Sequence, residues 1–254
     1  MKVRILGCGT SSGVPRVGND WGACDPEEPK NRRRRVSILV EHENTRILVD
    51  TGPDLREQLL DARVSDVTAV VWTHDHADHC HGIDDLRQLF HARGAPVEGY
   101  ARQETLETLL VRFGYIFEGK GGYPPVATPN LLPYELEIGT IKIRTVDQPH
   151  GDVMAAGLRF EAGGRSLVYA TDFHQLTDEM LELYRDTDLW IVDALRRHPH
   201  PSHGHLSQVL GWIEQVRPAH AILTHMDHSM DYAGLLTELP SSVEPGYDGM
   251  EIVL

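Results

Sequence analysis

The run VTAVVWTHDHADH, at residues 67–79, carries the clearest structural signal in this sequence. Its first half is apolar and β-branched, and a run of this kind predicts a buried strand. Its second half places His74 and His76 two residues apart, so an extended turn projects both rings toward one ion. Asp78 and His79 follow at the expected start of a helix, where they can face a second ion. Imidazole and carboxylate without a thiolate suit zinc, manganese or iron at a site with open coordination positions.

Short apolar runs and turn signals on both sides of this stretch predict one α/β domain. Expected strands lie at residues 3–6, 37–41, 46–50, 67–73, 141–146, 165–171, 189–192, 221–224 and 250–254. Expected helices lie at residues 83–91 and 206–216. We interpret this order as a four-layer αβ/βα sandwich over residues 1–254, with a loop or insertion near residues 114–133.

The composition limits the classes of partner. The formal net charge of -14 repels polyanions at long range, which argues against long nucleic acids but allows small phosphoesters where metal ions supply positive charge. Three widely spaced cysteines, Cys8, Cys24 and Cys80, do not resemble a disulfide framework. The N-terminal residues lack the apolar region of a signal peptide, and no stretch reaches membrane-spanning length. We therefore expect a cytoplasmic protein without a membrane partner.

The ligand run has the His-x-His-x-Asp-His spacing of the metallo-β-lactamase superfamily, which the chain resembles over nearly its whole length. That resemblance implies three further ligands at later strand ends: His150 in DQPHG, Asp172 in YATDF and His225 in ILTHMDH. It also implies the grouping of the ligands, in which one metal is held by His74, His76 and His150, the other by Asp78, His79 and His225, and Asp172 bridges them. Lactam-cleaving members commonly carry a cysteine where Asp172 stands, so lactamase activity is not expected.

Three more segments are similar to the PhnP-like phosphodiesterase branch of this superfamily: GCGTSSGVP near the start, RRRRVSILV at residues 32–40 and GYDGMEI near the end. The similarity implies hydrolysis of a small cyclic or nucleotide-like phosphodiester by water activated between two divalent ions, manganese or zinc. Tyr115, Phe117 and Tyr123 could stack against a ring of such a substrate. By the same likeness, the protein could form a homodimer.

The stretch HPHPSHGHLSQVL contains the expected proton donor. By resemblance, His203 is the general acid that protonates the departing oxygen, and His205 is the alternative for this role. Asp78 counts among the expected catalytic residues as well as the ligands. His198 and His200 are interpreted as solvated loop residues.

Several other residues have expected supporting roles. Asp50 in LVDTG should hold the ligand loop by hydrogen bonding without touching metal. Ser11 and Ser12 belong to a turn-rich loop that could offer backbone N–H groups to the substrate. Some PhnP-like proteins have a separate structural zinc held by a cysteine cluster, whereas this chain retains Cys24 and His228 alone. Two ligands cannot close a tetrahedral site, so no structural zinc is expected.

Other functions on the same scaffold are weighed against this one. A ribonuclease Z-like enzyme would need a long basic arm, but residues 114–133 carry only Lys120 as a cation. A glyoxalase II-like thioesterase would need a helical C-terminal region, and 29 residues follow His225 (254 minus 225). A non-catalytic PqqB-like binding or carrier protein would be expected to lose ligands, and this sequence has lost none.

Overall fold

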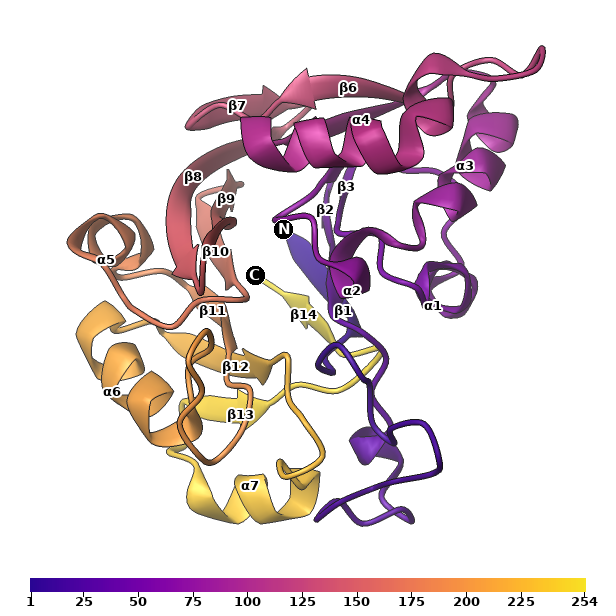
Figure 1. The fold of residues 1–254 in the computed structure, drawn as a ribbon. Helices are drawn as coiled ribbons and strands as arrows, with labels where there is room; N and C mark the ends of the chain where they lie inside the picture. The colour runs from indigo at the N-terminus through magenta and orange to yellow at the C-terminus, as the bar shows by residue number, and fades with distance from the viewer.

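Two seven-stranded sheets form the centre of the molecule, one built mainly by each half of the chain (Figure 1). The computed structural model describes residues 1–254. The first sheet has the order β14-β1-β2-β3-β4-β5-β6, with strands β1 (Lys2–Gly7), β2 (Ser37–His42), β3 (Thr45–Val49), β4 (Ala69–Val71), β5 (Val97–Ala101), β6 (Ala127–Leu131) and β14 (Glu251–Val253). The second has the order β13-β12-β11-β10-β9-β8-β7, with strands β7 (Glu135–Ile138), β8 (Ile141–His150), β9 (Val153–Ala162), β10 (Arg165–Ala170), β11 (Leu189–Asp193), β12 (His220–Thr224) and β13 (Val243–Pro245).

Helices cover the outer face of each sheet (Figure 1). The first half contributes α1 (Leu55–Ala62), α2 (Ala77–Cys80), α3 (Leu86–Arg93) and α4 (Gln103–Glu118), with the short 3-10 helices η1 (Pro29–Asn31) and η2 (Ile83–Asp85). The second half contributes α5 (Asp178–Tyr184), α6 (Leu206–Val216) and α7 (Tyr232–Glu238). The expected four-layer αβ/βα sandwich is therefore the observed fold. No helix combines the length and apolar character needed to cross a membrane.

Side chains that point alternately to the two faces of each strand explain how the layers pack. In β2, Ile38 and Val40 join the core between the sheets, whereas Leu39 joins the cluster beneath the helices. Successive strand residues point to opposite faces, so a strand buried on both sides must be apolar throughout. In β4, Val71 and Val70 divide between the same two clusters.

The direction of the strands brings the functional loops together. Strands β3 to β6 run parallel, as do β10 to β13. Parallel strands end at the same edge of a sheet, and loops on such a rigid edge commonly carry function. The loops that follow β3, β4, β10 and β12 contain Asp50, His74, Asp172 and His225, respectively.

The expected loop near residues 114–133 is wrong for about half of its length. Residues 114–118 complete α4, which is kinked at Phe113 (φ -127°, ψ 29°), and residues 127–131 form β6. Pro129 suggested a loop because proline cannot donate to a sheet ladder, but β6 is the edge strand of its sheet, where proline is tolerated. Residues 119–126, between α4 and β6, and residues 132–133 are outside helices and strands, as expected.

Candidate metal centre

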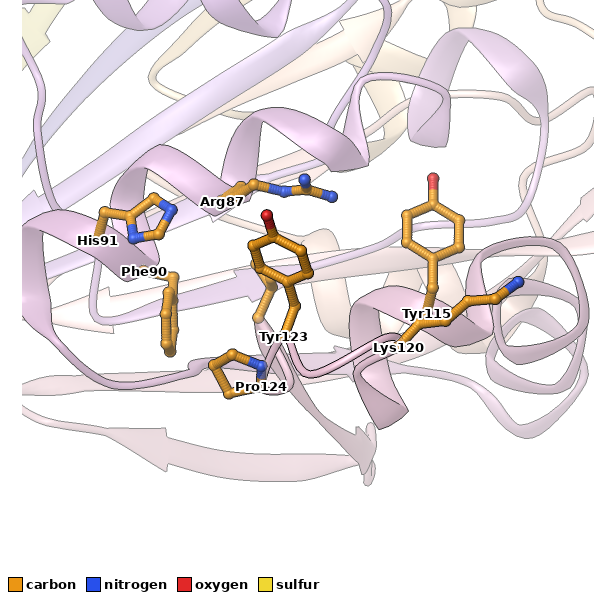
Figure 2. A pocket seen from close by; sticks show the side chains of 8 residues that line it. Arg87, Phe90, His91, Tyr115, Lys120, Tyr123 and Pro124 are labelled. Atoms are coloured by element: carbon orange, nitrogen blue, oxygen red, sulfur yellow. The ribbon is translucent and has the colours of Figure 1, made fainter.

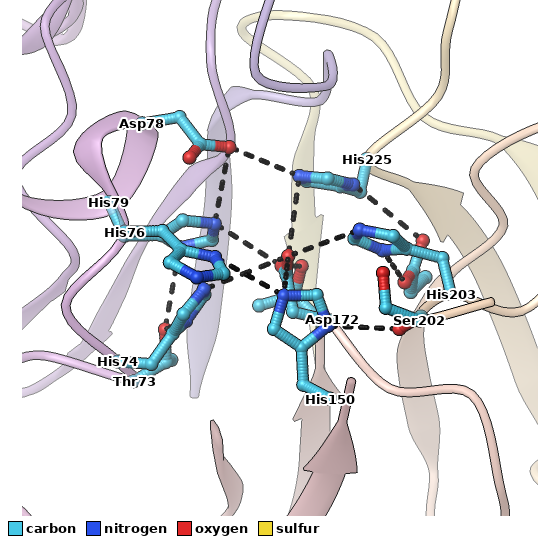
Figure 3. A network of polar contacts seen from close by, with 12 residues as sticks. Thr73, His74, His76, Asp78, His79, His150, Asp172, Ser202, His203 and His225 are labelled. Carbon is cyan, nitrogen blue, oxygen red and sulfur yellow. Dashed lines mark hydrogen bonds and ion pairs between the residues drawn. The ribbon is translucent and has the colours of Figure 1, made fainter. Parts of the chain in front are cut away.

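The seven predicted ligands meet at one place, between the loops of the two halves (Figure 3). His150 is the last residue of β8 rather than a residue beyond it, and Asp172 lies two residues past β10. Asp172 and His225 adopt left-handed backbone conformations, with φ of 59° and 57°. Such conformations are uncommon for residues other than glycine and often mark functional sites.

The first group contains His74, His76 and His150, whose ligand atoms lie within 4.8 Å of one another. Nε2 of His150 lies 3.2 Å from Nδ1 of His76. Nδ1 of His150 donates to the backbone oxygen of Ser202 at 2.9 Å, which leaves Nε2 as the free nitrogen that faces the group. Three nitrogens thus converge on one point.

The second group contains Asp78, His79 and His225. Oδ2 of Asp78 lies 3.4 Å from Nε2 of His79 and 3.4 Å from Nε2 of His225. Both Asp78 and His79 come from α2, the short helix that follows the ligand loop. One loop thus serves both groups, as its sequence predicts.

Asp172 lies between the two groups. Its Oδ1 is 3.8 Å from Nε2 of His74, 3.6 Å from Nε2 of His150 and 3.7 Å from Nε2 of His225. Its Oδ2 is 3.2 Å from Nε2 of His79 and accepts a 2.5 Å hydrogen bond from the hydroxyl of Thr171. This carboxylate is the only one that reaches both groups, which is the geometry of a bridging ligand.

The donor set fits divalent metal ions. Nε2 of His74 and Nε2 of His79 are buried and have no hydrogen-bond partner. The separations of 3.2–3.8 Å between facing N and O atoms exceed the roughly 2.7–2.9 Å of a charge-assisted hydrogen bond. Ligands at about 2.0–2.1 Å from a tetrahedral zinc ion are roughly 3.3 Å apart, which matches this spacing. The His and Asp clusters therefore support divalent-metal binding.

Two buried aspartates orient histidines of the site. Asp50 accepts from Nδ1 of His79 at 2.8 Å and from the backbone and side chain of Thr73, as expected for a residue that holds the ligand loop. Asp193, the last residue of β11, lies 2.8 Å from Nδ1 of His203. Sequence reasoning missed Asp193, although the strand-ending motif Ile-Val-Asp repeats the Leu-Val-Asp that ends at Asp50.

The structure separates the two candidate proton donors. His203 is buried, and its Nε2 lies 3.8 Å from Oδ1 of Asp172 (Figure 3). His205 caps the start of α6, and its Nδ1 lies 3.0 Å from the side-chain oxygen of Gln208. His200 is half-buried and stacks edge-on against the ring of His203, so it is not a purely solvated residue.

The buried carboxylates and imidazoles of the centre shift one another's pKa values. Burial would raise the pKa of Asp172, but His225 and His79 beside it hold that pKa well below its usual range. Burial likewise opposes charge on His225, yet Asp172 and Asp78 raise its pKa to about 9. In contrast, burial and the neighbouring His79 lower the pKa of His74 well below its ordinary value. Buried carboxylates of this kind require cations close to them.

The structure also places Ser11, Ser12 and Cys24, which the sequence singled out. Ser11 and Ser12 are exposed, on a loop whose neighbour Thr10 donates its backbone N–H to Met226, the residue after His225. Cys24 is buried 3.9 Å from Nη1 of Arg33 and belongs to none of the metal-ligand clusters.

The three aromatic residues that were expected to stack against a substrate ring, Tyr115, Phe117 and Tyr123, lie in different surroundings. Phe117 is buried and packs edge-on against Trp72. Tyr115 and Tyr123 instead line a common hollow outside the metal centre.

Comparison with known proteins agrees with this geometry. A family model described as "Beta-lactamase superfamily domain" matches residues 45–226. The crystal structure of a new diphosphatase from the PhnP family superimposes with a TM-score of 0.91 and 34% identity, covering 99% of this chain and 96% of that one. The chain therefore belongs to the metallo-β-lactamase superfamily and, within it, to the PhnP family.

Two further similar proteins are a curated sequence relative and a solved structure of lower identity. An octanoyltransferase of Porphyromonas gingivalis (strain ATCC BAA-308 / W83) is 32% identical over 263 residues, which cover all of this chain and 52% of that protein. The chain thus spans about half the length of the curated relatives it matches. Zinc-bound PqqB from Methylobacterium extorquens has a TM-score of 0.81 and 18% identity, with all of both chains covered. At that identity the likeness shows the fold alone.

Proposed function

We propose that this protein is a metal-dependent phosphodiesterase that hydrolyses small cyclic or nucleotide-like phosphodiesters. Two divalent ions, manganese or zinc, would be held by the two groups of ligands, with Asp172 between them. The observation that carries the proposal is the position of His203, whose Nε2 faces Asp172 while its Nδ1 is fixed by the buried Asp193. An imidazole placed beside a metal site but bound by a carboxylate on its far side is available for proton transfer.

The bound ions would neutralise charge on the phosphoryl oxygens and lower the pKa of an attacking water. The residues of the chain supply the rest of the chemistry. Asp50 fixes the ring of His79, and the backbone oxygen of Ser202 fixes the ring of His150, so that each Nε2 points inward. His203 donates a proton from Nε2 to the departing oxygen, while Asp193 holds the ring in place.

The relatives support hydrolysis at phosphorus more than acyl transfer. The solved PhnP-family structure is named a diphosphatase, and diphosphates and phosphodiesters share the phosphoryl centre. Octanoyl transfer has no comparable support in the site, because the thiols of Cys8, Cys24 and Cys80 are all buried. Burial also raises the pKa of Cys80 to about 12, which keeps this thiol protonated and poorly nucleophilic.

The assignment of His203 is tested by changing the leaving group. We expect His203→Ala to reduce the hydrolysis rate of an alkyl phosphodiester by roughly 10²- to 10⁴-fold, the usual contribution of general acid catalysis. The same variant should lose far less activity on bis(p-nitrophenyl) phosphate, because nitrophenolate leaves without a proton. His205→Ala is the matched control and should affect both substrates little. Equal losses on both substrates would refute the role of His203.

The substrate class is tested separately. Protein reconstituted with manganese and, in parallel, with zinc is assayed against cyclic diesters, linear nucleotide-like diesters, diphosphates, precursor tRNA and an octanoyl thioester. Turnover of a small diester identifies the phosphodiesterase. Turnover of only the tRNA, only the thioester, or no substrate despite bound metal would favour the ribonuclease Z-like, acyl-transfer or PqqB-like function instead.

A further inference from the structure

A second hollow lies away from the metal centre, between α3, the end of α4 and the turn before β6 (Figure 2). It encloses about 230 Å³. Its walls combine aromatic rings with cations, among them Phe90, Tyr115, Tyr123, Arg87, Lys120 and His91. None of these residues belongs to the metal-ligand clusters.

A tight turn presents Lys120 and Tyr123 together. Each donates its backbone N–H to the backbone oxygen of the other, at 3.2 Å and 3.1 Å. Gly121 and Gly122 between them have φ of 61° and 89°, the left-handed conformations that a two-residue hairpin turn requires. Residues paired across such a turn project their side chains to the same face. The Gly-Gly turn therefore brings Lys120 and Tyr123 together at the rim of the hollow, from where the Lys120 side chain extends past Tyr115 (Figure 2).

The balance of charge in the hollow is opposite to that of the whole chain. Arg87 lies 3.6 Å from Oδ1 of Asp84, and Oδ2 of Asp84 accepts a 2.8 Å hydrogen bond from the hydroxyl of Tyr115. Lys2, Lys30 and Lys142 each have a side-chain partner, whereas Lys120 has no hydrogen bond or ion pair through its side chain. In a chain of net charge -14, an unpaired lysine in an aromatic hollow is the feature that distinguishes this surface.

The rings are open to a ligand. Tyr123 is 70% exposed, although a tyrosine in a packing role would be largely covered. In Figure 2, the ring of Tyr123 stands between Phe90 and Tyr115, with Arg87 beside it. The hollow is smaller than the roughly 300–1,000 Å³ of pockets that enclose drug-sized ligands, so it suits one ring system with a charged substituent.

We propose that this hollow is a binding site for a nucleoside monophosphate, separate from the metal centre. The base stacks on Tyr123, and the phosphate pairs with Arg87, which lies beside that ring in Figure 2. The flexible side chain of Lys120 turns toward the phosphate on binding. Aromatic side chains accept any base face, and a nearby cation adds the charge that a phosphate needs. The site is independent of the proposed phosphodiesterase activity.

Calorimetry on the full-length, metal-loaded protein tests this proposal with the four ribonucleoside monophosphates, adenosine and inorganic phosphate as probes. We expect at least one monophosphate to bind more tightly than adenosine or phosphate alone. Tyr123→Ala should weaken that binding by about tenfold or more, because loss of one base–aromatic stack has an effect of this order. Lys120→Gln should weaken it by a smaller factor. Tyr134→Ala, at a tyrosine that is 63% exposed outside the hollow, is the matched control and should bind normally.

The hydrolytic assay separates this site from the metal centre. Tyr123→Ala should hydrolyse bis(p-nitrophenyl) phosphate at the wild-type rate, and thermal unfolding should show an intact fold. Absence of binding by all four monophosphates would overturn the proposal. It would also be overturned if Tyr123→Ala bound them with unchanged affinity, since the ligand would then lie elsewhere, such as at the metal centre.

Discussion

In each half of the site, a buried aspartate at the end of a strand lies against Nδ1 of a histidine. Asp50 ends the run ILVD and lies 2.8 Å from Nδ1 of His79, while Asp193 ends WIVD and lies 2.8 Å from Nδ1 of His203. Both carboxylates are fully buried. In each case the strand end fixes one ring nitrogen, so the other nitrogen faces the centre. His79 lies with the metal ligands, whereas His203 lies at their margin, which suits a proton donor.

This arrangement makes Asp193 a positioning residue whose effect passes through His203. We expect Asp193→Asn to lower kcat on an alkyl phosphodiester by about tenfold or more and to leave KM nearly unchanged. On bis(p-nitrophenyl) phosphate the loss should be small, as for His203→Ala. Because both residues act as one unit, the double variant should be no slower than His203→Ala alone.

The control for the Asp193 and His203 variants is Asp186→Asn, at an exposed aspartate that pairs with Arg217. It should leave both substrates unaffected. If the double variant instead lost the product of the two single effects, Asp193 would act independently of His203.

The sequence predicted the seven clustered residues but not the groups that orient His203. Each of the seven stands near the end of an apolar strand, and the resemblance to the superfamily singled out His150, Asp172 and His225 among such positions. Asp193 and His203 are ten residues apart and meet only because the loop after β11 folds back on itself. The same loop places His203 beside Asp172, whereas the ring of His205 lies against Gln208.

At the scale of elements, α2 is held against the loop after β3 by close backbone contact. Thr51 donates its N–H to the backbone oxygen of His79 and accepts one from Gly82, both at 2.7 Å. A Cβ atom at Gly52 would overlap the backbone oxygen of Asp78. Glycine is therefore needed here for close approach, and α2 positions both Asp78 and His79.

Gly52→Ala should displace α2 and disrupt the second ligand group, while His74, His76 and His150 keep their places. With the proposed two-ion centre, we expect the metal content to fall from about two ions per chain to about one, because the overlap falls on Asp78. Overpacking of this kind typically costs about 1–3 kcal/mol of stability, so the chain should still fold. Elemental analysis after dialysis measures the change. Gly114→Ala, where an added Cβ meets no atom within 4 Å, should retain both ions; loss of both ions or neither in Gly52→Ala would contradict this account.

The helix whose apolar residues recur at helical spacing was predicted correctly. The helix end whose conformation depends on packing against the core was not. The expected helix at residues 206–216 coincides with α6, because its apolar residues recur at helical spacing and pack on the second sheet. The end of α4 was mistaken for loop because Gly114 and the Pro-rich residues after it resemble turn signals. Packing of Ile116 and Phe117 in the core beneath the helices outweighs that local preference.

At the scale of the whole molecule, the C-terminal segment closes the first sheet. β14 pairs with β1, and the residues before it bond to Ile5 within β1 and to Cys8 just beyond it. Asp248 joins these parts, because its carboxylate accepts from the backbone N–H groups of Cys8 at 3.1 Å and Arg34 at 2.8 Å. The side chain connects positions more than 200 residues apart, so its charge state bears on the stability of the entire fold.

Burial raises the pKa of Asp248 to about 6, despite the hydrogen bonds from Arg34 and Cys8 that oppose the rise. An unfolded aspartate has a pKa of about 3.9, so between these values the folded chain keeps a proton that the unfolded chain releases. This group therefore adds stability as the pH falls from about 7 toward 4, up to roughly 3 kcal/mol. Asp248→Asn lacks this gain.

Urea unfolding of wild type and Asp248→Asn at pH 7.5, 6.5 and 5.5 measures the effect as a difference between the two proteins. Protonation of the metal ligands weakens both alike, so it cancels in that difference. We expect the stability advantage of wild type over Asp248→Asn to grow as the pH falls. Asp20→Asn, at an exposed carboxylate that pairs with Arg16, is the control and should show a constant difference, because Arg16 lowers the pKa of Asp20 and keeps it charged across this range. A constant difference for Asp248→Asn as well would mean that the buried carboxylate keeps its charge across this range.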